Sequence, residues 1–244
     1  PSSGEILRSV NLPVEGRNGD AAVELVFQLV DALRADDPSP FLGIGIGAPG
    51  VIDTSSGIVR WSVNLDWADL RLGSLLEERY GLPVVVANDS HAAALAELTF
   101  FRRPRPNNLV VIRVGRGVGA GIIVNGQLFQ GDGYGAGEFG HVSLGHDGAQ
   151  CRCGRTGCLE TRVSMRSLVH AVAAVEPTIT DESGLVAAFH EPEGRLPTVG
   201  VHLDRLQAAA EDEFHGRNGI LRLVDDVAGG VRLNAGRGHH SPQG

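Results

Sequence analysis

The sequence predicts an α/β protein with two lobes and one loop braced by a metal ion. Helix-period segments and strand-like apolar segments alternate along the chain, which favours an α/β architecture. An arginine- and proline-rich segment separates two groups of strands, and all three cysteines fall close together. With 244 residues, of which 42% are hydrophobic, the chain can bury a substantial core.

The first lobe is expected to place polar side chains at the end of a strand. Its elements are a helix at Ala21–Leu33, a strand at Phe41–Ile46, a short extended piece at Ile58–Trp61, a helix at Gly73–Tyr80, a strand at Val84–Ala87 and a helix from Ser90 to about Phe100. Ser90 is expected to cap that last helix. Asn88 and Asp89 then project from a strand-to-helix junction, where α/β sheets bind ligands.

The second lobe follows a linker at Arg102–Asn108. Its elements are a strand at Leu109–Val114, a glycine-rich turn at Gly115–Gly121, a returning strand at Ile122–Val124 with an Asn125-Gly126 hairpin signal, a loop at Gly131–Gly140, a helix at Thr161–Val175, and weaker helical stretches at Leu203–Phe214 and Ile220–Val227. We expect an N-terminal lobe at 1–105, a C-terminal lobe at 106–230 and a disordered tail at 231–244.

Charge and composition exclude several classes of function. The net charge of −8 argues against a broad nucleic-acid surface within these residues. The chain contains no lysine, which excludes a Walker-type phosphate lysine and Schiff-base chemistry. No apolar run is long enough to span a membrane and no signal peptide is visible, so we expect a cytoplasmic protein.

The cysteines have the spacing of a metal site. Cys151, Cys153 and Cys158 lie within eight residues, and His141 precedes them by ten positions. Three sulfurs and one imidazole suit tetrahedral Zn²⁺, and a closed site of this kind is structural because no position is left for water or substrate. The alternative, three free core thiols, fits poorly with the polar, glycine-rich residues between the cysteines.

A second group of polar residues suits a polyol ligand. The amide of Asn88 can donate and accept, and the carboxylate of Asp89 can take a proton from a hydroxyl group. The alternative for this pair is plain helix capping. Glu138, His141 and Glu160 add polar groups near the expected metal, although either carboxylate could instead only support the imidazole of His141.

Two weaker signals accompany these groups. The glycines at Gly115, Gly117 and Gly119 could present backbone amides to a phosphate, but a twisted hairpin turn is the commoner reading because no helix follows. Trp61 and Trp67 flank Asn64 and could stack on a sugar, although core packing is the more common role for at least one of them.

Together these residues resemble the ROK family of repressors, uncharacterised reading frames and sugar kinases. The resemblance covers about Gly4 to Arg166 and rests on these motifs: Ala48-Pro49-Gly50, Asn64, Asn88-Asp89, the Gly115–Gly121 hairpin, Glu138-Phe139-Gly140-His141, and the segment from Cys151 to Glu160. It is closest to the N-acetylglucosamine- or xylose-repressor type of ROK transcriptional regulator.

The resemblance implies a two-lobed fold like that of actin and hexokinase, with sugar between the lobes. By motif match, it implies sugar contacts from Asn88, Asp89, Glu138, His141 and Glu160, with Asn64 a further contact, and a zinc site of His141, Cys151, Cys153 and Cys158. In a kinase, Asp89 is the implied general base and ATP with Mg²⁺ the implied cofactors. A homodimer or homotetramer is also implied.

The chain departs from the kinase pattern at both phosphate segments. ROK kinases open with an Asp-x-Gly-x-Thr strand, and this chain, which starts at Pro1, is expected to begin just after it. Where kinases usually carry Gly-Thr-Gly, this chain has Gly115-Arg116-Gly117. The sequence is therefore expected to be a fragment: the sugar-sensing effector domain of a ROK regulator, with DNA bound only through a domain that precedes it. The alternatives are an ATP-dependent hexose or N-acetylhexosamine kinase and a remnant that binds nothing.

Overall fold

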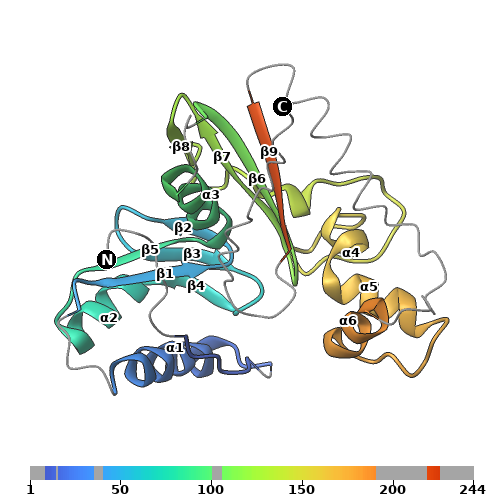
Figure 1. Ribbon diagram of the computed structural model, residues 1–244, viewed down its shortest axis with the longest axis horizontal. Coiled ribbons are helices and arrows are strands. Elements are labelled where there is room, and N and C mark those ends of the chain that lie inside the picture. The colour runs from blue at the N-terminus through green and yellow to red at the C-terminus, as the bar shows by residue number, and fades with distance from the viewer. Residues whose placement is uncertain (1–8, 15, 36–40, 101–105, 191–218, 226–244) are drawn as a thin grey trace, which may run out of the picture.

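The computed structural model describes residues 9–14, 16–35, 41–100, 106–190 and 219–225, and it has two halves joined by a helix (Figure 1). The first half comprises α1 (Gly19–Arg34), β1 (Ile44–Ala48), β2 (Val51–Asp53), β3 (Ile58–Ser62), β4 (Trp67–Leu70), α2 (Leu72–Tyr80) and β5 (Val84–Asn88). The joining helix is α3 (Asp89–Phe100). The second half comprises β6 (Asn108–Val114), β7 (Val118–Val124), β8 (Gln127–Phe129), the 3-10 turn η1 (Phe139–His141), α4 (Glu160–Val163), α5 (Met165–Ala173), α6 (Glu182–His190) and β9 (Gly219–Asp225).

The first half combines a parallel strand pair with an antiparallel meander. β1 pairs with β5 in parallel, so that Ala48 lies opposite Asn88 where both strands end. β2, β3 and β4 form the antiparallel sheet. The helices α1 and α2 bury their apolar faces against these strands, in a core of Ala22, Val23, Val30, Ala48, Ile52, Val59, Trp67, Leu72, Leu76 and Val86. Burial of one face of each helix and strand therefore fixes the positions of the strand ends, and the polar residues at those ends are held in place with them.

The joining helix packs on the sheet of the second half, whose strand order is β8-β7-β6-β9. Its Ala94 is fully buried in a small core with Leu109, Val111 and Ile123. The close approach requires glycine in β7, because a Cβ at Gly121 would collide with the Ala94 side chain and the backbone oxygen of Ser90. The junction after β5 is thus held by the cores of both halves.

Several predicted elements are confirmed. The helices at Ala21–Leu33 and Gly73–Tyr80 correspond to α1 and α2, and the strands at Val84–Ala87 and Leu109–Val114 to β5 and β6. The strand expected at Phe41–Ile46 is β1, displaced by two to three residues. Asn125 and Gly126, both with positive φ, form the two-residue turn between β7 and β8, as their type predicts.

Two predictions for the second sheet were wrong. The glycine-rich turn expected at Gly115–Gly121 is only three residues long, since β7 begins at Val118 and its glycines serve the packing of α3. The helical stretch expected at Ile220–Val227 is β9 up to Asp225, parallel to β6. A short apolar run does not distinguish a buried strand from a helix, and here pairing with β6 decides.

Two predictions about helix ends were also wrong. Ser90 does not cap α3: the helix begins at Asp89, and the side chain of Asn88 accepts the free amides instead. The helix expected at Thr161–Val175 is broken into α4 and α5 at Ser164, whose extended backbone and hydroxyl cap α5 by accepting from Ser167 N. The sequence analysis did not anticipate β2, β4 or α6.

Some expectations lie outside the described residues. These are the stretch at Leu203–Phe214, the tail at 231–244 and most of the linker at Arg102–Asn108. The domain limits proposed at 105 and 230 stay predictions. Within the described ranges, no helix has the length and apolarity that crossing a membrane requires.

Candidate functional site

A cavity of about 1400 Å³ lies where the two halves meet. Strand ends and loops from both halves line it, including the turn after β1, the junction of β5 and α3, the hairpin after β6, and η1. The structure brings to this one cavity all the side chains predicted to contact sugar: Asn64, Asn88, Asp89, Glu138, His141 and Glu160. Their contact with a sugar stays a prediction, but the shared location that it requires is present.

Asn88 is a buried connector at the junction. Its Oδ1 accepts from the backbone amides of Ser90 at 2.8 Å and His91 at 3.1 Å, which caps α3. Its Nδ2 donates to the carbonyl of Gly50 at 2.9 Å and lies 3.4 Å from Oε1 of Glu138. The capping alternative is therefore correct for Asn88. The same side chain also fixes the turn after β1 at the edge of the cavity through its hydrogen bond to Gly50.

Asp89 forms an ion pair inside the cavity. Its Oδ2 lies 2.7 Å from Nη1 of Arg113, near the end of β6, and its Oδ1 accepts from the Ser90 hydroxyl at 3.3 Å. The Arg113 side chain is 15% exposed and that of Asp89 34%. The pair is thus partly shielded from water, and both carboxylate oxygens already accept from the protein.

Glu138 sits among other charged groups. Burial raises the pKa of its carboxyl, His141 opposes that rise, and the charges of Asp89 and Glu160 add to it. Its Oε2 lies 3.8 Å from Nε2 of His141. The imidazole therefore presents one nitrogen to this carboxylate, within the cavity.

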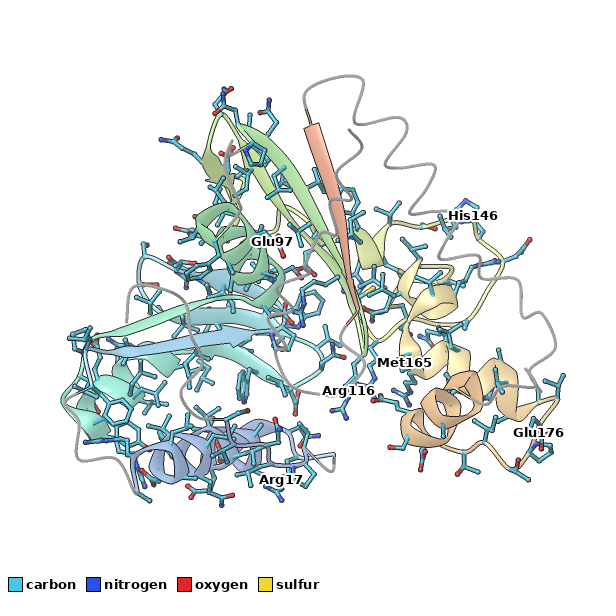
Figure 2. The ribbon with its side chains drawn as sticks, in the orientation of Figure 1. Arg17, Glu97, Arg116, His146, Met165 and Glu176 are labelled. Carbon is cyan, nitrogen blue, oxygen red and sulfur yellow. The ribbon has the colours of Figure 1, made fainter. Side chains whose placement is uncertain are left out.

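The hairpin after β6 has satisfied amides and an anchored arginine. Gly115 N donates to Gly117 O at 2.9 Å, and Val118 N donates to Oε2 of Glu160 at 3.0 Å. Arg116, at the hairpin end beside Met165 (Figure 2), pairs with Glu182 of α6 at 3.3 Å. Phosphate binding by Gly115, Gly117 and Gly119 stays a prediction, and the amide of Gly115 is already used by a hydrogen bond within the hairpin.

The segment around Asn64 separates the two tryptophans. Trp67 is buried and donates from its indole nitrogen to the carbonyl of Gly19 at 2.9 Å, so its role is core packing. Trp61 is 49% exposed and lines the cavity. Asn64, in the turn between β3 and β4, accepts at Oδ1 from Nη1 of Arg152 at 3.2 Å.

The predicted metal ligands converge. The ligand atoms of His141, Cys151, Cys153 and Cys158, the Cys3His cluster, all lie within 4.8 Å of one another. Sγ of Cys153 is 3.7 Å from Sγ of Cys158, and Nδ1 of His141 is 3.6 Å from Sγ of Cys151. Tetrahedral zinc with bonds of about 2.3 Å to sulfur and 2.0 Å to nitrogen requires edges of about 3.8 and 3.5 Å.

The observed separations therefore fit Zn²⁺. Turn hydrogen bonds set the geometry, since Cys151 N donates to Arg155 O at 2.7 Å and Gly154 N donates to Cys151 O at 2.9 Å. Burial raises the pKa of the Cys158 thiol to about 12, aided by the neighbouring sulfurs. A cation among the sulfurs offsets that cost of ionisation, which is a physical reason for this donor set to hold a metal.

The sequence analysis missed two arginines whose side chains contact predicted site residues. Arg113 pairs with Asp89, and its signal was a cation at the end of an otherwise apolar strand. Arg152 contacts Asn64, and its only signal was a place between two metal ligands. Both arginines line the cavity.

Comparisons with known proteins agree with this geometry. The sequence pattern of the ROK family matches residues 2–195. A glucokinase of Halalkalibacterium halodurans is 34% identical over 234 residues, which are 93% of this chain and 67% of that protein. A putative xylose repressor of Caldicellulosiruptor sp. is 36% identical over 184 residues, 73% of this chain and 46% of the repressor. The chain thus spans about two thirds of one relative and about half of the other.

A solved structure gives the same result for the fold. The ROK family glucokinase from Streptomyces griseus, in complex with glucose and AMPPNP, superposes with a TM-score of 0.61 and 31% identity, over 80% of this chain and 61% of that one. The two-lobed α/β fold of actin and hexokinase, expected from the sequence motifs, is therefore confirmed.

Proposed function

The chain belongs to the ROK family, and on that premise we propose that it is the sugar-sensing effector domain of a transcriptional regulator. The ligand is a hexose or an amino sugar in the cavity between the two halves. Amide and carboxylate groups there offer both donors and acceptors to hydroxyl groups. The sugar contacts are Asn64, Asn88, Asp89, Glu138, His141 and Glu160.

The ion pair of Asp89 with Arg113 carries this proposal. A sugar kinase needs a carboxylate that accepts a proton from the attacking hydroxyl. The Oδ2 of Asp89 already accepts from a guanidinium at 2.7 Å, so a sugar hydroxyl competes with Arg113 for that oxygen. This arrangement suits a carboxylate that binds a hydroxyl without removing its proton.

The Cys3His cluster braces the sugar site. His141, Cys151, Cys153 and Cys158 hold structural Zn²⁺, which when bound supplies rigidity and no open coordination position. One ring nitrogen of His141 faces the sulfurs and the other faces Glu138. Metal binding therefore orients the imidazole for a sugar hydroxyl.

If the chain is part of a regulator, we propose that residues outside this chain bind the DNA. The net charge of −8 leaves these residues without the excess of cations that phosphate neutralisation requires. A putative xylose repressor is 36% identical over 73% of this chain. We assign DNA contact to another part of the whole regulator.

A sugar kinase is the second candidate, because a glucokinase is 34% identical over 93% of this chain. In that case Asp89 is the general base and releases Arg113 when sugar binds. ATP and Mg²⁺ are then required, with the phosphates near Gly115 and Gly117.

One experiment separates the two candidates. Glucose, galactose and N-acetylglucosamine are titrated into the zinc-loaded chain by calorimetry, and ADP release is then measured with ATP and Mg²⁺. The sensor predicts that one sugar binds with no ADP release above a sugar-free control. Sugar-dependent ADP release that disappears in Asp89→Asn establishes the kinase instead, and binding of no sugar contradicts both candidates.

A further inference from the structure

Arg152 joins the metal-binding loop to the opposite wall of the cavity. It lies between two metal ligands, Cys151 and Cys153, in the second half. Its Nη1 donates to Oδ1 of Asn64, 88 residues earlier in the chain, at 3.2 Å. Both residues line the cavity, so the hydrogen bond crosses from one half to the other beside the predicted sugar position.

The Asn64 end of this contact is anchored in the first half. In the same turn, Leu65 N donates to Ser62 O at 3.3 Å, and the carbonyl of Leu65 accepts from Gly19 N at 2.8 Å. The indole of Trp67 donates to Gly19 O. The backbone of the turn is therefore tied to the start of α1, while the Asn64 side chain projects toward the second half.

The Arg152 end is anchored by the metal-binding turn. The backbone of Cys151 is hydrogen-bonded to both Gly154 and Arg155, which closes a tight turn around Arg152. The ligand atoms of Cys151 and Cys153, on either side of Arg152, lie within 4.8 Å of those of His141 and Cys158, so an ion bound among them would order this turn. When the ion leaves, the sulfurs lose their common partner, and the position of Arg152 is less well defined.

The contact also fixes which way the Asn64 amide points. Arg has only donors, so Oδ1 must face Arg152 and Nδ2 must point away from it. That nitrogen lies beside Gly117, 3.8 Å from where a Cβ on this glycine would stand. The amide donor is thus held between the turn of the first half and the hairpin of the second, ready to donate to a hydroxyl group.

We propose that Arg152 is a positioning residue. Through it, occupancy of the metal site controls the position of the Asn64 side chain on the opposite side of the cavity. Its guanidinium holds the amide of Asn64 toward the cavity when the loop is ordered and releases it when the metal is lost. The sugar-affinity part of this inference rests on the proposed function. The coupling between loop and turn does not, because it can be measured without sugar.

Hydrogen exchange of the whole chain, followed by mass spectrometry, tests the coupling. In the wild type, removal of zinc by a chelator is expected to raise exchange in residues 141–158 and also in residues 62–67. In Arg152→Ala, residues 62–67 are expected to exchange faster even with zinc and to change no further on chelation. If these residues respond to chelation in Arg152→Ala as in the wild type, the inference is wrong.

Two further variants serve as controls for this experiment. Arg155→Ala removes a charge from the same loop and from the cavity lining but keeps the hydrogen bond of Arg152 to Asn64, so residues 62–67 should still respond to chelation as in the wild type. Asn64→Ala breaks the contact from the far side without touching the metal loop, and it should also abolish the response of residues 62–67. Metal analysis of each variant shows whether zinc is retained. If Arg152→Ala no longer binds zinc, the result for Asn64→Ala is used to test the coupling instead.

Sugar affinity gives the second readout. Loss of one hydrogen-bonding partner should weaken binding by about 3- to 10-fold in Arg152→Ala, which is more than in Arg155→Ala, and binding should be partly restored in Arg152→Lys. Unchanged affinity in Arg152→Ala contradicts the positioning role while the proposed function stands. Failure of the wild type to bind any sugar contradicts the proposed function, and the exchange experiment still decides the coupling.

Discussion

Arg113 and Asp89 form a 2.7 Å ion pair across the junction between the β6 end and the start of α3. Because the pair is partly shielded from water, its two charges should interact more strongly than an exposed pair. A double-mutant cycle with Arg113→Met and Asp89→Asn should give a coupling free energy of unfolding of about 1–3 kcal/mol. Urea denaturation of the four sugar-free proteins measures it.

The exposed pair of Arg79 and Asp31 is the matched control. It has a similar separation, 3.1 Å, but both side chains are about half exposed. Its cycle should give no more than about 0.5 kcal/mol. Additive losses at Arg113 and Asp89 would show that the pair is not energetically formed, which removes the observation that carries the sensor proposal.

Two histidines near the proposed metal site, His141 and His146, should differ in their effect on zinc affinity. His141 has a nitrogen 3.6 Å from Sγ of Cys151, whereas His146 lies at the outer end of the loop, away from Arg116 (Figure 2). His141→Ala should lower zinc affinity by more than the roughly 10- to 100-fold that loss of a supporting residue costs. His146→Ala should bind zinc like the wild type.

Metal content measured by plasma mass spectrometry, together with thermal unfolding, checks this prediction. The wild type is expected to hold one zinc per chain and to unfold at a lower temperature after chelation, because metal binding stabilises only the folded loop. Equal zinc content in the two histidine variants would remove His141 from the ligand set.

The loop that carries Glu138 depends on one glycine. Gly137 has a φ of +91°, and a Cβ there would collide with the carbonyl of Ala120 in β7. Gly137→Ala should therefore cost at least about 2 kcal/mol of unfolding free energy, from backbone strain and the displaced loop. Gly133→Ala, where a Cβ has open space in the same loop, should stay within about 1 kcal/mol of the wild type. Similar denaturation midpoints for the two variants would contradict this account.

How much of the site the sequence predicts depends on the distance between its parts along the chain. The Cys3His cluster is predictable because its ligands fall within eighteen consecutive positions, 141–158, and a tight turn brings them together. Asn88 and Asp89 are predictable because an apolar strand visibly ends beside them. Local patterns were sufficient in both cases.

The pairs formed by Arg113 and Arg152 could not be predicted in the same way. Asp89 and Arg113 meet only because α3 packs on the second sheet, and Asn64 meets Arg152 only because the two halves close around one cavity. Likewise, Ile220 to Asp225 is a strand because β6 offers an edge, which no local pattern reveals. Tertiary placement decides these features, so a motif match names the site residues without their partners.

Asp53, at the end of β2, makes the stability of the first half sensitive to acid. Hydrogen bonds from Ser55, Ser56 and Tyr134 hold the pKa of its carboxyl well below the ordinary value of 3.8, and Arg60 pairs with the same carboxylate at 3.1 Å. Because the folded value is depressed, the unfolded chain takes up the proton first as the pH falls. The stabilisation is complete above about pH 5 and is lost progressively as the pH falls below the ordinary value of 3.8, which the carboxyl has in the unfolded chain.

Asp53→Asn should therefore be less stable than the wild type at pH 7, and the difference should shrink as the pH falls from 5 toward 2.5. Urea denaturation across this range measures it. Asp69→Asn removes a charge from the exposed side of the same Arg60 and controls for net charge. A difference between wild type and Asp53→Asn that stays constant with pH would mean that the hydrogen bonds to Asp53 do not favour its ionised form, and that shape alone accounts for the cost of the substitution.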